Sequence, residues 1–152
     1  MKISKININK FRAFRNQEFK VGAQITAIAG QNGTQKSTLL GMITQVFTIT
    51  DKKSPLFGES PLCGGNYKSA FQDKFRLSPK YDKPKEHEWT LSFDNGSDFT
   101  VESIKRSDSD IIRFWRKGLR GKGDGYIQYP TIFLSLKRVL PLAESGDVKN
   151  SN

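Results

Sequence analysis

The sequence has a single cysteine, Cys63, and a single histidine, His87, among its 152 residues. One cysteine excludes an intramolecular disulfide framework, and the two residues together are too few for a zinc site built from such ligands. No apolar run approaches the roughly 20 residues that a membrane-spanning helix needs. The first ten residues also lack the apolar core of a signal peptide. From these absences we expect a cytoplasmic protein with no membrane contact.

Acidic residues are scarce as well. The chain has 25 Lys and Arg against 15 Asp and Glu, a net charge of +10. Such a charge favours a polyanionic partner such as nucleic acid or a nucleotide. The length suits one domain, and 11 phenylalanines are enough to build a core. We predict a single lobe over residues 1–143, followed by a flexible tail over 144–152.

Hydrophobic periodicity predicts strands first and then a helix. Alternating isoleucines predict a strand over 2–11, and a short second strand ends at Val21. Residues 25–29 form a compact apolar run, which is typical of a strand covered on both faces. From Ser37 to Phe47 the apolar residues recur at helical spacing.

A second region alternates more clearly, at Trp89, Leu91 and Phe93 and again at Phe99 and Val101. The Asn-Gly pair between the two runs suggests a two-residue turn. That turn would pair side chains of opposite faces, because a slip of one residue flips every side chain. We therefore predict an odd-length loop that pairs Phe93 with Phe99 and Leu91 with Val101.

Three weaker patterns complete the expected fold. They are a short helix within 67–75 and strands over 111–115 and 132–136. The elements together predict an α/β fold with α+β character. We expect a mixed sheet, a helix after the phosphate-binding loop described next, and an antiparallel hairpin subsheet.

The most specific chemistry lies between the run at 25–29 and the predicted helix. There the chain reads Gly30-Gln31-Asn32-Gly33-Thr34-Gln35-Lys36-Ser37-Thr38, which follows the P-loop pattern G-x-x-x-x-G-K-[ST] except at Gln35. Backbone N–H groups and the helix N-terminus of such a loop bind phosphate. Lys36 is expected to reach the β- and γ-phosphates, Ser37 to ligate Mg²⁺, and Thr38 to donate to the α-phosphate. The predicted cofactors are ATP and Mg²⁺, held by Gly30 to Thr38.

Gln35 is the departure from this pattern. Glycine at that position lets the backbone approach the phosphate and adopt dihedral angles that side chains disfavour. Either the backbone angles here tolerate a side chain or the affinity for nucleotide suffers. Two other interpretations stay open, namely a degenerate loop that binds weakly or not at all, and an accidental strand–turn–helix junction.

The stretch Ile6-Asn7-Ile8-Asn9-Lys10-Phe11-Arg12-Ala13-Phe14 is followed by the two strands and by Gly30-Gln31-Asn32-Gly33 with Ser37-Thr38-Leu39-Leu40 behind it. In these features residues 1–43 resemble the start of an ABC-class ATPase head of the SMC, RecF or OLD type, whose opening motif is I-x-x-F-R-x-F. The resemblance implies that Arg12 lies near the nucleotide phosphates, with Phe11 and Phe14 packing its strand. A solvated surface arginine is the alternative for Arg12.

Beyond the first third the resemblance weakens. The family has a signature motif, a Walker B strand ending in acidic residues and a switch histidine. Here the last apolar strand ends in Ser135-Leu136-Lys137-Arg138, no Ser-Gly-Gly type of signature is found, and the context of His87 does not suit a switch. The chain thus resembles the first lobe of a head, truncated before these motifs. We assign no catalytic residue and expect binding of Mg-ATP with little turnover unless a second lobe or head joins, from a homodimer or a separate chain.

Basic residues interleaved with aromatic ones gather in the last third of the chain. They are Lys105, Arg106, Arg113, Arg116, Lys117, Arg120 and Lys122. Positive charge beside aromatic rings suits the backbone and the bases of DNA, and a solvated strand face is the competing interpretation.

These features predict an ATP- and Mg²⁺-binding lobe of an SMC/RecF/OLD-like ATPase, acting on DNA or in a bacterial defence or repair complex. The alternative is a non-enzymatic basic DNA-binding module with an inactive P-loop.

Overall fold

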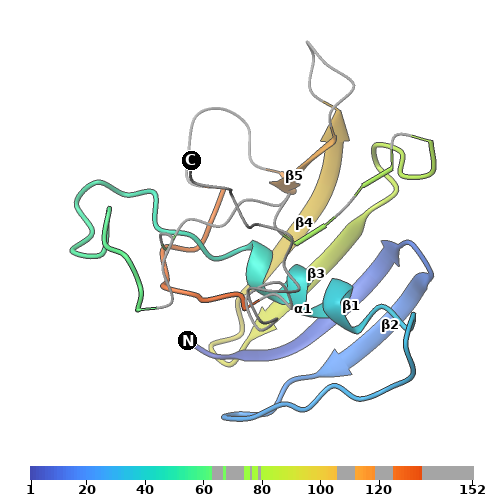
Figure 1. Cartoon of the computed structure of the whole chain (residues 1–152), viewed down its shortest axis with the longest axis horizontal. Coiled ribbons are helices and arrows are strands. Elements are labelled where there is room, and N and C mark those ends of the chain that lie inside the picture. The colour runs from blue at the N-terminus through green and yellow to red at the C-terminus, as the bar shows by residue number, and fades with distance from the viewer. Residues whose placement is uncertain are drawn as a thin grey trace, which may run out of the picture.

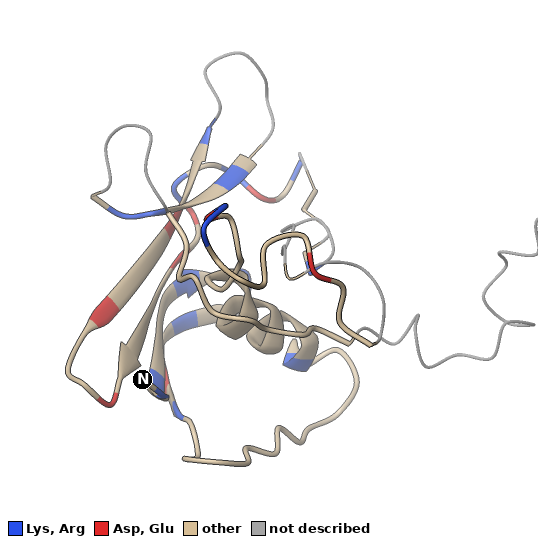
Figure 2. Cartoon of the chain, turned by 90° about the vertical axis from the view of Figure 1, so that its left-hand side faces the viewer, with Lys and Arg blue, Asp and Glu red and all other residues tan. Residues whose placement is uncertain are grey.

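A computed structural model of the chain describes residues 1–62, 67, 74–75, 77–78, 80–105, 112–118 and 125–134. Five strands form one antiparallel sheet in the order β2-β1-β3-β4-β5, and one helix lies against a face of it (Figures 1 and 2). The elements are β1 (Ile3–Phe11), β2 (Phe14–Lys20), α1 (Lys36–Gln45), β3 (Glu88–Phe93), β4 (Asp98–Lys105) and β5 (Ile112–Arg116).

Most of the predicted strands are confirmed. The strand expected over 2–11 is β1, and its alternating Ile6 and Ile8 are almost fully buried. The short strand ending at Val21 is longer than expected, because β2 begins at Phe14. The strand predicted over 111–115 is β5, with residue 111 outside the described residues.

Three other predicted segments lie partly or wholly outside the described residues. Residues 132–134 form no strand, and 135–136 lie outside the described part of the chain. The short helix within 67–75 lies mostly outside it, and so does the whole tail over 144–152.

The β3–β4 hairpin has the predicted odd-length loop but a different register. Leu91 pairs with Phe99 and Trp89 with Val101, so the predicted pairing of Phe93 with Phe99 is wrong by two residues. The reason is Gly96, whose φ of 79° lets a three-residue loop over 94–96 close the hairpin. A shift of two residues keeps the same side chains on the buried face.

The strand predicted over 25–29 is not formed. The segment has no ladder partner, and Ile25 is 87% exposed. An apolar run of this kind becomes a buried strand only when neighbouring strands flank it, and the described residues place none beside it. The sheet is therefore antiparallel rather than mixed, and the one parallel pairing among the described residues is an isolated bridge between Phe47 and Ile127.

The core lies between α1 and the sheet. Leu39 and Met42 of the helix join the buried face of the strands, where Phe11, Trp89 and Phe114 form an aromatic cluster. The indole Nε1 of Trp89 donates to the Met42 carbonyl over 3.1 Å. This bond fixes the helix, and with it the loop at its N-terminus, against the middle of the sheet.

Candidate functional site

The residues of the phosphate-loop pattern form a closed turn before α1. The ammonium of Lys36 donates to the carbonyls of Gly30 at 2.7 Å and Gln31 at 2.6 Å, while the hydroxyl of Thr34 donates to Gln31 over 2.7 Å. A lysine ammonium has three donors. Two of them hold the loop, so the third can donate to an incoming phosphate oxygen.

Gln35 has the conformation that the pattern reserves for glycine. Its φ of 61° and ψ of 26° lie in the left-handed region, which costs a residue with a Cβ roughly 1–2 kcal/mol. Its side-chain oxygen is buried and has no hydrogen-bond partner among the described residues. The backbone at Gln35 therefore adopts the left-handed conformation with a side chain in place, in a strained and incompletely satisfied form.

The other loop residues fit a phosphate ligand in part. A Cβ at Gly30 would lie 2.9 Å from the Thr34 hydroxyl, so the turn depends on a glycine there. Asn32 and Gly33 form the exposed tip, where the φ of Gly33 is 84°. The N–H groups that open α1 point along the helix axis, where they attract anions.

The described residues offer fewer groups for the predicted Mg²⁺ than for the predicted phosphates. Ser37 is exposed on the first turn of α1 and offers one hydroxyl ligand. Among the described residues no group of three or more His, Cys, Asp or Glu side chains is placed to hold a metal ion. Further ligands would come from nucleotide phosphates and water, as is usual for Mg²⁺. Thr38 is buried, so its contact with the α-phosphate stays a prediction.

The strain at Gln35 gives a prediction for stability. We expect Gln35→Gly to raise the free energy of unfolding by about 0.5–1 kcal/mol, because glycine removes the left-handed penalty and the orphaned amide at some cost in chain entropy. Gln35→Ala keeps the Cβ in the left-handed region and serves as the matched control. Urea unfolding of the two variants should rank glycine above alanine, and the reverse order would show that the backbone at 35 is unstrained.

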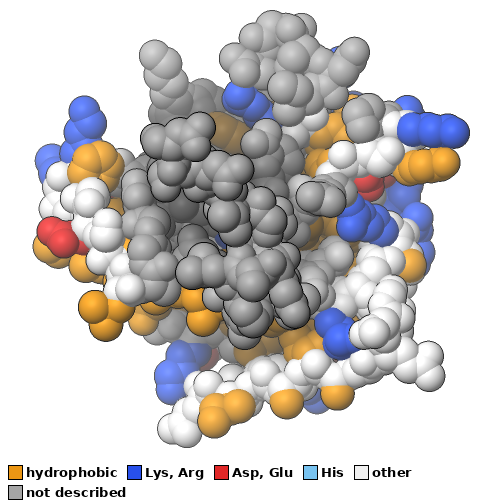
Figure 3. Space-filling view, in the orientation of Figure 1, with side chains coloured by type: hydrophobic (Ala, Val, Ile, Leu, Met, Phe, Trp, Pro, Cys, Tyr) orange, Lys and Arg blue, Asp and Glu red, His pale blue; other side chains and the backbone are white. Residues whose placement is uncertain are grey.

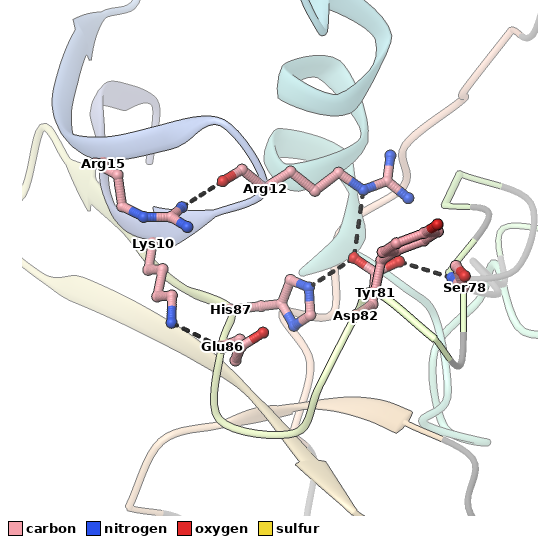
Figure 4. Close-up of a pocket in the computed structure, with 8 residues that line it drawn as sticks. All are labelled: Lys10, Arg12, Arg15, Ser78, Tyr81, Asp82, Glu86 and His87. Carbon is pink, nitrogen blue, oxygen red and sulfur yellow. Dashed lines mark hydrogen bonds and ion pairs between the residues drawn. The ribbon is translucent and has the colours of Figure 1, made fainter.

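Arg12 lies at a separate pocket of about 400 Å³, between the β1–β2 turn and the loop before β3 (Figure 4). Its Nε is 3.6 Å from Asp82 Oδ1. Its φ of 52° is in the left-handed region, and its carbonyl accepts a hydrogen bond from Arg15. Backbone strain of this kind is often found at functional sites. The pocket is lined by Lys10, Arg12, Arg15, Ser78, Tyr81, Asp82, Glu86 and His87.

Asp82, His87 and Ser103 form a buried chain of hydrogen bonds beneath the surface of this pocket. His87 Nε2 lies 3.2 Å from Asp82 Oδ1, and Nδ1 lies 3.0 Å from the Ser103 hydroxyl. Since an ionised carboxylate only accepts hydrogen bonds, Nε2 carries the proton and the Ser103 hydroxyl donates to Nδ1. Asp, His and Ser in this order resemble a hydrolase triad. Ser103, however, is fully buried and cannot reach a substrate, so the chain of bonds positions Asp82 instead.

The surroundings shift the pKa values of both ionisable members. Burial lowers the pKa of His87 below 6.5, although the Asp82 carboxylate acts in the opposite direction. Burial alone would raise the pKa of Asp82, but the Ser78 N–H, the His87 ring and the Arg12 charge together lower it. At neutral pH the pair is therefore a neutral imidazole beside an ionised carboxylate.

These shifts predict that acid destabilises the fold. A neutral His87 contributes stability that is complete above pH 6.5 and is lost as the pH falls toward its lower folded pKa. The contribution of Asp82 is lost in the same direction, at a pH below 3.8. Because the chain has one histidine, an NMR titration of its ring protons reads this pKa directly. A value at or above 6.5 would contradict the buried geometry, and so would equal urea midpoints at about pH 7.5 and 5.5.

The predicted basic cluster is only partly described, since Arg106, Arg120 and Lys122 lie outside the described residues. Lys117 and Arg116 are among the remaining members that have partners within the chain. Lys117 binds Glu88, which raises the pKa of the lysine, and the Arg116 guanidinium lies 4.8 Å from the centre of the Phe99 ring. Arg113 is exposed on β5, and Lys105 ends β4. DNA binding at this cluster stays a prediction.

Sequence reasoning did not find Asp82 and Ser103 as partners of His87. Asp82 and His87 lie in the loop before β3, whereas Ser103 lies on β4. The contact of His87 with Ser103 forms only when β3 pairs with β4. The one available signal was a lone histidine next to the alternating apolar residues of β3.

A loop whose lysine contacts the loop carbonyls, followed by a helix packed on a sheet, is typical of the nucleotide-binding P-loop class. A family model described as an AAA domain matches residues 5–131. The chain belongs to this family, which indicates a nucleotide-binding, ATPase-like function with general use of Mg²⁺. No curated protein matches the sequence. None of the helices in the described ranges is long and apolar enough to cross a membrane.

Proposed function

We propose that this chain is the Mg-ATP-binding lobe of an SMC/RecF/OLD-like ATPase. The observation that carries the proposal is the Lys36 ammonium, which is fixed over the loop carbonyls at the start of α1. ATP would place its phosphates against the loop N–H groups, with the free donor of Lys36 on a terminal phosphate oxygen. When bound, Mg²⁺ would neutralise phosphate charge, and Ser37 would be its ligand from the protein.

The same proposal includes a second lobe, from another copy or another chain. It is supported by the segment 25–29, which has the composition of a buried strand but stands without a ladder partner and exposes Ile25. Exposed apolar residues beside a binding loop suit a surface that another polypeptide covers. Hydrolysis also requires a positioned water molecule, which we assign to groups of that second lobe. The proposal also includes that the lobe acts on DNA as part of a defence or repair complex.

Calorimetric titration of the purified chain with Mg-ATP, paired with a phosphate-release assay, tests the proposal. We expect saturable binding and turnover near the uncatalysed background. Absence of binding would overturn the nucleotide site, and in that case DNA binding would favour the module with an inactive loop. Rapid turnover that depends on Lys36 would instead overturn the need for a second lobe.

A further inference from the structure

A basic surface forms where the β1–β2 turn meets the loop before β3. We name it the turn–loop patch. It contains Lys10, Arg12, Arg15, Lys80, Tyr81, Lys83 and Lys85. The patch holds six cations, whereas its two carboxylates are Asp82 and Glu86. Figure 3 shows Lys and Arg side chains gathered over this loop and turn, on the right of the view. A local excess of positive charge attracts polyanions.

Not all of these cations are equally available. Lys10 lies 3.0 Å from Glu86, and Arg12 lies 3.6 Å from Asp82. Arg15 has no carboxylate within 4.0 Å among the described residues, and its Nη1 donates to the Arg12 carbonyl and, over 2.7 Å, to the Phe14 carbonyl. A guanidinium has five N–H donors. These bonds therefore fix the group at the pocket while leaving donors for an anion.

An aromatic side chain stands beside these charges. Tyr81 lines the same pocket and is 73% exposed. The ammonium of Lys80 lies 5.2 Å from the centre of its ring. Exposed rings flanked by cations are the platforms on which unpaired bases stack, each base contributing about 1–3 kcal/mol. An acidic peptide would use the cations but give the ring no role.

We propose that the turn–loop patch binds single-stranded DNA. One phosphate enters the pocket on Arg15, the adjoining base stacks on Tyr81, and the lysines of the loop follow the neighbouring phosphates. A strand fits better than a free mononucleotide, because the cations extend along the loop beyond the pocket. This inference rests on the DNA part of the proposed function, and it assigns the contact to residues other than the basic cluster predicted from the sequence.

The test is a fluorescence anisotropy titration of a labelled oligothymidylate of about 20 nucleotides with the whole chain, at low and moderate salt. We expect Arg15→Ala and Tyr81→Ala each to weaken binding about tenfold. Tyr81→Phe should bind like the original chain, because the ring is kept. Arg113→Ala, an exposed arginine of β5, is the matched control and should change the affinity less than about twofold.

The opposite pattern overturns the proposal. If Arg113→Ala weakens binding while Arg15→Ala and Tyr81→Ala do not, the DNA surface lies on β5. If the oligonucleotide does not bind and Arg15→Ala weakens Mg-ATP binding, the pocket serves the free nucleotide. If the original chain does not bind Mg-ATP, the proposed ATP site is wrong, but the oligonucleotide titration still tests the DNA site. Failure of the proposed function and failure of this inference are therefore distinguishable. Because Tyr81 is exposed, its variants should keep the circular dichroism spectrum of the folded chain.

Discussion

Lys36→Ala should weaken Mg-ATP binding by roughly 30- to 150-fold. The ammonium is the cation that the structure fixes at the loop, with carbonyl bonds of 2.7 and 2.6 Å to Gly30 and Gln31. Removing a hydrogen bond to a charged group costs about 2–3 kcal/mol, and every 1.4 kcal/mol is tenfold in Kd. The substitution also releases the two carbonyls, so the loop loses a constraint as well as a charge. Calorimetric titration of both chains measures the change.

Lys52→Ala is the matched control, since this lysine is exposed and follows the helix instead of opening it. It should leave the affinity for nucleotide unchanged. Lys36→Arg should recover little, because a planar guanidinium cannot replace a compact ammonium that bridges two carbonyls. Equal affinities for Lys36→Ala and the unchanged chain would mean that the loop does not hold the phosphates.

The antiparallel part of the fold was predictable because its signal is local. Trp89, Leu91 and Phe93 alternate with polar residues on one strand, and this pattern fixes which face is buried without reference to the rest of the chain. The register of the hairpin was not predictable to the residue. Loops of three and of five residues keep the same faces, and only the left-handed Gly96 decides between them.

The segment 25–29 shows the limit of the same reasoning. Its composition predicts a strand buried on both faces, and the described structure places no neighbouring strand beside it. Burial on two faces is a property of the assembled sheet and not of the segment. An apolar pattern can therefore indicate a neighbouring strand that the described part of the chain does not contain.

The candidate site divides in the same way. The phosphate loop was predictable because its chemistry is carried by consecutive residues, from Gly30 to Ser37. The turn–loop patch was not, since Arg15 and Tyr81 are far apart in the sequence and line one pocket only in the folded chain, where β1 pairs with both β2 and β3. Arg12 was assigned to the phosphate site from the sequence and lies at the turn–loop patch in the structure. It was expected near the phosphates by resemblance, and its described contacts are with the pocket.

Trp89→Ala should lower the free energy of unfolding by about 3–5 kcal/mol, which is a large part of the 5–15 kcal/mol that a domain of this size has. The indole is fully buried, with ring centres of Phe11 and Phe114 at 5.6 and 5.1 Å. Its removal leaves a cavity in the middle of the sheet and takes the donor from the Met42 carbonyl. The helix that carries Lys36 is then less firmly held, so the affinity for Mg-ATP should fall together with the stability.

Two further variants separate packing from the hydrogen bond. Trp89→Phe keeps most of the ring volume but no donor, and it should lose about 1–3 kcal/mol. Trp115→Ala is the matched control, because this second tryptophan is only partly buried, on β5, and should cost less than Trp89→Ala. Urea unfolding followed by circular dichroism gives the three values. If Trp89→Ala costs no more than Trp115→Ala, the helix is held to the sheet by the aliphatic contacts of Leu39 and Met42, and the affinity for nucleotide should then be independent of Trp89.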